Sequence, residues 1–159
     1  MFGFTDLWKF FVGFFLIFPI VSIVHQAGHV FFARLFGAKI KFTLGVGKKL
    51  FQYKAFEIRK IYFLDAWCHY ENVANRGKWV HVLIYSGGTL FNAVTVLIVN
   101  YLILKGVLTS SLFFYQFVYF SVYFIFFALF PVEYRKDHPS DGLAIFYVLK
   151  YGKAYDPID

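Results

Sequence analysis

Two histidines spaced four residues apart, His25 and His29, are the side chains in this sequence best suited to chemistry. On a helix, positions i and i+4 lie on one face, about 6 Å apart, and at that spacing both imidazoles can hold one metal ion. A zinc hydrolase of this kind also needs a carboxylate beside the first histidine, as general base for the metal-bound water. Here that position is Gln26, whose amide cannot take up a proton at neutral pH. The motif therefore predicts a metal site that lacks the general base needed for hydrolysis.

A tetrahedral site needs a third protein ligand, which leaves one position for water. The candidate is Asp141, which precedes Gly142 and opens the last apolar stretch of the chain. An aspartate at that place can equally be the N-cap of a helix, so both roles are open. Two imidazoles and one carboxylate suit zinc, and we expect one zinc ion as the cofactor.

The composition indicates a membrane protein. The chain has 159 residues, of which 60% are hydrophobic and 25% aromatic, more than a soluble domain of this size can bury. We expect the lipid bilayer as its solvent and no nucleic acid as a partner. The single cysteine, Cys68, excludes an intrachain disulfide.

Three apolar stretches are long enough to cross a bilayer, which takes about 20 residues each. They cover residues 7–33, 79–104 and 112–130 approximately. The first has no small-residue cleavage site at its end and contains the histidine motif, so we interpret it as a retained span and not as a signal peptide. We therefore predict a membrane α-helical fold with three transmembrane helices, formed by residues 1–159 as a single domain.

The segments outside the spans carry most of the charge. Residues 34–78 alternate apolar and polar side chains, which predicts a small antiparallel sheet at the membrane surface. The tail, residues 131–159, contains one short apolar stretch at 143–149, which predicts a short C-terminal helix that cannot span.

Orientation follows from the basic residues. Ten of the sixteen lysines and arginines lie between Arg34 and Lys78, and four more follow Pro131. The positive-inside rule then predicts an N-terminus outside the cell and a cytoplasmic loop and C-terminus, in a multi-pass protein of a prokaryotic plasma membrane. At 1.5 Å per residue, His29 and His25 would lie about 7 and 13 Å inward from Arg34, where paired histidines indicate function.

The order of motifs adds a family resemblance. The motifs are, in chain order, His25-Gln26-Ala27-Gly28-His29, Phe36-Gly37-Ala38-Lys39, Leu44-Gly45-Val46-Gly47-Lys48-Lys49-Leu50, Gly87-Gly88-Thr89-Leu90-Phe91-Asn92, Phe130-Pro131 and Ser140-Asp141-Gly142. In this order the chain resembles the site-2 protease family of intramembrane zinc metalloproteases, over nearly its whole length and as a bare three-helix core.

The resemblance implies roles for five residues. His25, His29 and Asp141 would be the zinc ligands, and Gln26 would stand at the place of the catalytic glutamate. Asn92 would bind the substrate carbonyl or the developing oxyanion, although an interhelical hydrogen bond is an equal alternative for it. The family usually has a proline where this chain has Gly88, a departure that weakens inferences about substrate positioning but not about the metal.

The resemblance also implies a function, the cleavage of a transmembrane peptide near the cytoplasmic face. Because Gln26 removes the general base, we expect this chain to be inactive or nearly so. Gln26 is then either an engineered change that traps the enzyme with its substrate, which the intact remainder of the motif favours, or the mark of a natural pseudoprotease. The alternative is a non-catalytic module that binds transmembrane peptides or a regulatory membrane partner. A homo-oligomer is also open.

Overall fold

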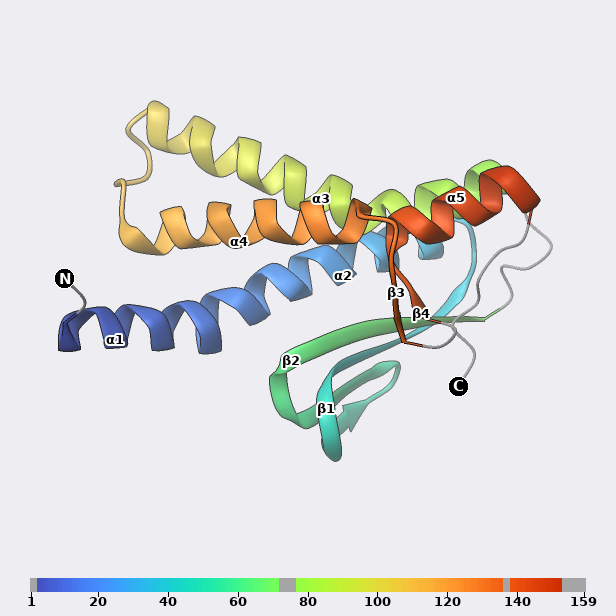
Figure 1. The fold of residues 1–159 in the computed structure, drawn as a ribbon, viewed down its shortest axis with the longest axis horizontal. Helices are drawn as coiled ribbons and strands as arrows, with labels where there is room; N and C mark the ends of the chain where they lie inside the picture. Colours follow the sequence, from blue (N-terminus) through green and yellow to red (C-terminus); the bar gives the residue numbers. More distant parts are fainter. Residues whose placement is uncertain (1–2, 72–76, 136–137, 153–159) are drawn as a thin grey trace.

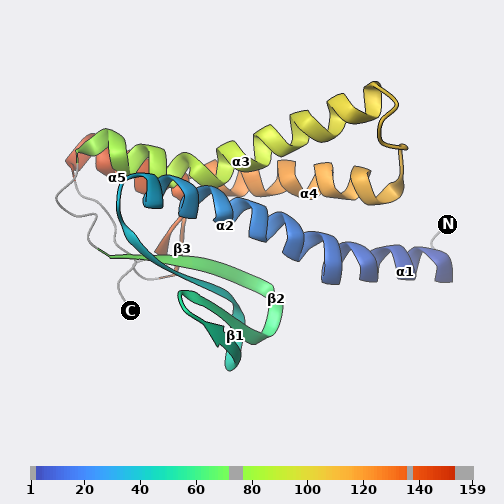
Figure 2. The ribbon, with the colours of Figure 1, turned by 180° about the vertical axis from the view of Figure 1, so that it is seen from behind.

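The computed structural model describes residues 3–71, 77–135 and 138–152. Its long helices run roughly along one axis, and a β-hairpin projects from one side of them (Figures 1 and 2). The elements in chain order are α1 (Phe4–Val12), a π-helical turn η1 (Gly13–Ile17), α2 (Phe18–Leu35), β1 (Lys39–Tyr53), β2 (Phe56–Glu71), α3 (Lys78–Leu104), α4 (Leu112–Leu129), β3 (Glu133–Arg135), β4 (His138–Pro139) and α5 (Asp141–Tyr151).

Three helical segments are long and apolar enough to span a bilayer: Asp6–Leu35, Lys78–Leu104 and Leu112–Leu129. The predicted spans are thereby confirmed, with ends that shift by one or two residues. Large apolar side chains such as Tyr119 and Phe126 are exposed on the outside of the helices. A lipid-facing helix needs such a surface, because its backbone polar groups are satisfied internally and its side chains meet hydrocarbon.

The first span is irregular where η1 joins α2. Pro19 has no N–H to donate to the carbonyl one turn earlier, that of Phe15. The Tyr62 hydroxyl of β2 donates to that oxygen at 3.3 Å, and the ring of Phe63 packs edge-on against Phe15. The hairpin is therefore attached to the first span at the turn that the proline disturbs.

Strands β1 and β2 form the small antiparallel sheet that the alternating pattern predicts. Lys39–Leu44 pairs with Ala66–Glu71, and the tip of the hairpin folds back so that Phe56–Ile58 also lies beside β1. The bend needs Gly45, which has φ +88°, and a Cβ there would lie 2.5 Å from the Cα of Tyr62. A second, two-stranded pairing of β3 with β4 is not apparent from the sequence pattern.

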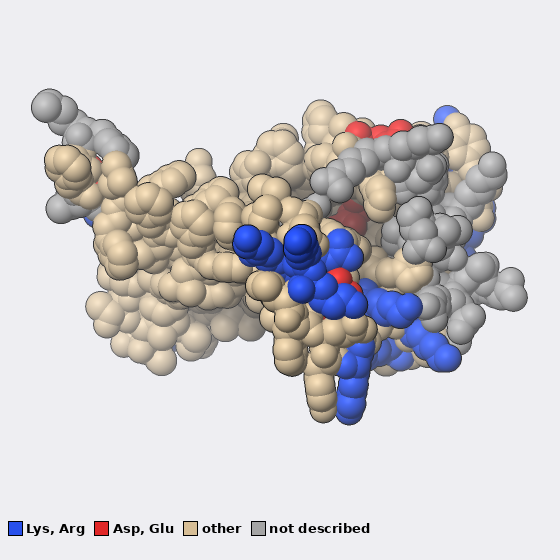
Figure 3. All heavy atoms as spheres, turned by 90° about the horizontal axis from the view of Figure 1, so that it is seen from below, with Lys and Arg blue, Asp and Glu red and all other residues tan. Residues whose placement is uncertain are grey.

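Basic side chains gather over the hairpin, as the space-filling view shows (Figure 3). They include Lys48, Lys49, Lys54, Arg59 and Lys60. Glu57 accepts a hydrogen bond from Arg59 at 2.8 Å and lies 3.5 Å from Lys49. The surface of the sheet is thus positively charged, in contrast to the apolar surface of the helices.

Glycines set the spacing between the helices that carry the motifs. A Cβ at Gly28 of α2 would overlap the carbonyl of Gly87 in α3, and a Cβ at Gly87 would lie 2.5 Å from the carbonyl oxygen of Gly28. The two backbones therefore touch, as small residues allow in membrane proteins. Helix α5, longer than the predicted 143–149, packs against α3 through Tyr85, Ala144 and Val148.

Candidate metal centre

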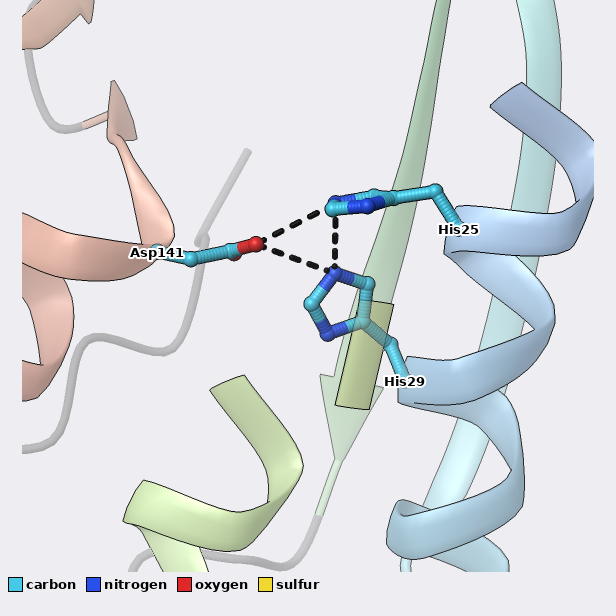
Figure 4. A group of neighbouring side chains, drawn as sticks. All are labelled: His25, His29 and Asp141. Carbon is cyan, nitrogen blue, oxygen red and sulfur yellow. Dashed lines mark hydrogen bonds and ion pairs between the residues drawn. The ribbon is translucent and has the colours of Figure 1, made fainter. Parts of the chain in front are cut away.

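Three side chains from α2 and α5 meet at one point (Figure 4). The Nε2 atoms of His25 and His29 lie 3.2 Å apart, and Oδ2 of Asp141 lies 3.2 Å from the first and 3.4 Å from the second. Both histidines are buried, and Asp141 is partly buried. Among the described residues this is the one group of three or more metal-ligating side chains close enough to share an ion.

His29 is held by a backbone group of α3. Its Nδ1 lies 2.8 Å from the carbonyl oxygen of Ile84, which can only accept a hydrogen bond. Nδ1 therefore carries a proton, which leaves Nε2, the nitrogen that faces His25 and Asp141, as the one that could bind a metal. A histidine that donates one ring nitrogen to a carbonyl and offers the other is typical of metal ligands.

His25 is held by a side chain of α3. Its Nδ1 lies 3.3 Å from Nδ2 of Asn92, and Asn92 has no exposed surface. The predicted site residue Asn92 is thus brought into the site. It contacts a histidine across the helix interface, which is the interhelical alternative given for it above.

Asp141 is positioned by its neighbour in the chain. Ser140 is the N-cap of α5: its Oγ accepts from the N–H of Leu143 at 3.2 Å and donates to the carbonyl of Phe130 at 2.7 Å. The capping role that was open for Asp141 therefore belongs to Ser140, and the Asp141 carboxylate reaches the histidines. Gly142 permits this approach, since a Cβ there would overlap the carbonyl of Leu129.

The two histidines favour the ionised form of the Asp141 carboxyl. Burial is the largest single influence on the pKa of Asp141, and it acts to raise that pKa. The adjacent His29 and His25 rings each act to lower the pKa, and together they outweigh burial and hold it well below its usual value. The carboxylate also stands in the first turn of α5, where the helix dipole favours negative charge. Asp141 is therefore ionised at neutral pH, as a metal ligand must be.

Gly88 of α3 lies directly beside the histidine pair. A Cβ at this position would come within 2.5 Å of Nε2 of both His25 and His29. The space around the two nitrogens exists because residue 88 has no side chain. The proline expected from the family resemblance could not stand here without displacing both rings.

Gln26 contacts the sheet. Its Nε2 donates to the backbone carbonyl of Ala66 in β2 at 2.8 Å. The residue at the general-base position is therefore engaged with the sheet, and the amide serves as a hydrogen-bond donor there.

The remaining histidines lie elsewhere. His138 is exposed and His69 is half-buried, whereas His81 of α3 is buried and stacks on Tyr85. The sequence reading missed three contributors to the site: the carbonyl of Ile84, the space at Gly88 and the cap at Ser140. Of these, the serine directly before the Asp-Gly pair carried a usable signal, because serine is a strong N-cap.

Comparison with known proteins identifies a relative but no described family or fold. No protein-family model matches the chain, and no solved structure matches it. The uncharacterized membrane protein YwmF of Bacillus subtilis (strain 168) is 46% identical over 156 residues, which cover 98% of both chains. Together with the three apolar helices, this makes the chain an integral membrane protein. The chain belongs to the family of the Bacillus subtilis membrane protein YwmF.

Proposed function

We propose that this membrane protein binds one zinc ion through His25, His29 and Asp141, on a scaffold like that of the site-2 proteases. The observation that carries the proposal is the triangle of ligand atoms, with sides of 3.2, 3.2 and 3.4 Å. Zinc bonds of about 2.0–2.1 Å to nitrogen or oxygen at tetrahedral angles separate neighbouring ligand atoms by about 3.3 Å. The triangle has the size that three of the four ligands of one zinc ion require.

The surroundings of the triangle support the same proposal. The ring nitrogens of His25 and His29 that face away from the triangle contact Asn92 and the Ile84 carbonyl, and such partners orient metal-binding histidines. Three protein ligands leave a fourth position open, as in catalytic and not in structural zinc sites.

The chain lacks a general base for hydrolysis at position 26. A bound zinc ion would polarise a peptide carbonyl and acidify a water molecule. Gln26 cannot accept the water proton, and its amide is bound to Ala66 instead. We therefore propose a protease-type scaffold that takes a transmembrane peptide near the cytoplasmic face and turns it over at least about 100-fold more slowly than its glutamate variant.

The test compares the chain with its Gln26→Glu variant. Both are purified in mild detergent, assayed for zinc by elemental mass spectrometry, and incubated with a panel of membrane peptides from the same cell. We expect one equivalent of zinc in each and cleavage by the glutamate variant. A glutamate variant that holds zinc but cuts no peptide would rule out the protease-type scaffold, and less than one equivalent in both would rule out the metal site.

One observation favours a second candidate, a non-catalytic module that binds transmembrane peptides. The hydrogen bond from Gln26 to Ala66 is one that an ionised glutamate could not make, so the local structure fits glutamine. This favours a natural pseudoprotease over an engineered change. Peptide capture by the chain as it stands, without cleavage by either form, is the result that this candidate predicts.

A further inference from the structure

We propose that the tip of the β1–β2 hairpin, residues 46–61, binds the headgroups of anionic phospholipids beside the first span. The tip begins where Val46 pairs with Ile61 and includes the turn between the two strands. Basic side chains gather on this part of the molecule (Figure 3). The surface needs neither the zinc ion nor a particular residue at position 26, so it is independent of the function proposed above.

The tip carries more positive charge than its own acidic group can balance. It contains five basic side chains and one acidic side chain, Glu57, which gives a net charge of +4. Lys49 and Arg59 are cross-strand partners, and like charges in that arrangement repel. Glu57 lies against both, 2.8 Å from Nε of Arg59 and 3.5 Å from Nζ of Lys49. The one carboxylate is thus taken up by this pair. Among the described residues, no carboxylate pairs with the other three cations, Lys48, Lys54 and Lys60.

Large apolar side chains stand between the basic ones. The exposed fractions of Leu50, Phe51 and Tyr53 are 64%, 53% and 61%, and all three lie between Lys49 and Lys54 in the chain. Basic side chains together with exposed leucine and aromatic side chains are typical of segments at the boundary between lipid headgroups and acyl chains. The apolar side chains can enter that boundary while the cations stay with the phosphates. This mixture favours a lipid as the anionic partner.

Contacts of β2 place the hairpin level with the spanning helices. Tyr62, the residue after the tip, donates to the carbonyl of Phe15 in the first span. One turn further along that span, the ring of Phe18 packs against Phe120 and Phe124 of α4, which is itself long and apolar enough to cross a bilayer. Figures 1 and 2 both show the tip beside α2 and not beyond the end of the helices. The cations would therefore lie within reach of the lipids that surround the spans.

A cation at this level needs a counter-charge. An ammonium group close to hydrocarbon is costly unless it pairs with an anion or reaches the headgroups. The phosphate of an anionic phospholipid supplies that charge, and each basic side chain near the surface strengthens binding to anionic lipid about fivefold. A zwitterionic headgroup carries its own cation and offers no net charge. We therefore expect the tip to prefer anionic over zwitterionic lipid.

Native mass spectrometry of the full chain in detergent micelles tests this preference. The protein is offered phosphatidylglycerol and phosphatidylcholine with the same acyl chains in equal amounts, and the ratio of the two bound lipids is measured. We expect phosphatidylglycerol to be favoured by the original chain. Lys48→Gln, Lys54→Gln and Lys60→Gln leave the Glu57 pairs in place, and each should lower the ratio about fivefold, toward equal binding in the triple variant.

A second triple variant is the matched control. Lys78→Gln, Lys105→Gln and Lys150→Gln remove the same charge from the ends of α3 and α5, outside the tip. We expect this variant to keep the ratio within about twofold of the original. A measurement on the unchanged chain needs no substitution: raising the salt from about 50 to 500 mM should lower the ratio, because salt screens exposed charges.

Four results would overturn the lipid surface. The first is an unchanged ratio in the triple tip variant, and the second is an equal fall in the control variant, which would assign the attraction to total charge. The third is a preference that salt does not weaken. The fourth is loss of the preference when soluble glycerol phosphate or polyglutamate is added at equal charge, because the surface would then take a free phosphate or an acidic polypeptide. None of these results depends on zinc content or peptide cleavage.

Discussion

The Nδ1 atom of His25 lies 3.3 Å from the side-chain nitrogen of Asn92, and Oδ1 of the same amide is buried without a hydrogen-bond partner among the described residues. A histidine that binds metal through Nε2 carries its proton on Nδ1 and needs an acceptor there. Rotating the Asn92 amide by half a turn exchanges Oδ1 and Nδ2, which places Oδ1 beside Nδ1 of His25 as the acceptor. The metal binding proposed above would therefore be coupled to the orientation of Asn92.

Replacing Asn92 should therefore weaken metal binding without removing a ligand. We expect Asn92→Leu to lower zinc affinity about 10- to 100-fold, the usual effect of losing the partner of a ligating histidine. Asn92→Asp keeps an acceptor and should retain most of the affinity. Competition with a chelating dye measures both. Equal affinities for the leucine variant and the original chain would contradict the coupling.

The three proposed ligands should each be needed for zinc. His25→Ala, His29→Ala and Asp141→Ala should all lose the stoichiometric ion, because two ligands cannot fix a tetrahedral site. Elemental analysis of purified protein measures the loss. His138→Ala is the control, since His138 is exposed and lies outside the triangle. Full zinc occupancy in any one of the three ligand variants would exclude that residue.

The space at Gly88 should be as important as the ligands. In Gly88→Ala the new Cβ would lie 2.5 Å from both Nε2 atoms, so we expect loss of zinc with the helices intact. Gly77→Ala at the start of the same helix is the matched control, because a Cβ there would meet no described atom within 4 Å. Zinc content and circular dichroism distinguish the two outcomes. Normal zinc binding by Gly88→Ala would show that the two histidines do not face the metal as proposed.

Ser140 should stabilise the end of the fold that carries Asp141. Ser140→Ala removes the cap of α5 and leaves the N–H of Leu143 without its acceptor, which should cost about 1–2 kcal/mol of the free energy of unfolding. Ser111→Ala is the comparison: Ser111 is the N-cap of α4, and its side chain makes no cap hydrogen bond in that described segment. Thermal unfolding in nanodiscs should show a clear loss for Ser140→Ala and little for Ser111→Ala. Equal losses would mean that Ser140 does not act as the cap.

The sequence predicts the elements well because their signals are local. Three long apolar stretches, an alternating basic loop and a short apolar tail each encode their own secondary structure, and all are confirmed. The gathering of His25, His29 and Asp141 was also foreseen, from helical spacing and motif order. Zinc, the substrate and the membrane orientation stay predictions.

The features that escaped prediction depend on contacts between distant segments. The hydrogen-bond partners of His29 and Gln26 are the backbone carbonyls of Ile84 and Ala66. Every residue has such a carbonyl, so the residue type does not predict these contacts. The motif shows only that Gln26 replaces a base, because the partner of its amide lies 40 residues away, in β2. Gly87 makes a close approach to Gly28, and nothing in the sequence pattern showed that Gly88 faces the histidines.

The separation of His25 and Asp141 along the chain has a consequence for folding. They are 116 residues apart, so an ion held by both would act as a cross-link between the first span and the last helix. A link of that length would close about three quarters of the 159-residue chain into a loop. The zinc supply in the cell would then set how firmly the first span and the last helix are joined. At a free zinc concentration 100 times the dissociation constant the gain is about 2.7 kcal/mol. Metal starvation would loosen the C-terminal helix first and leave the spans in the bilayer.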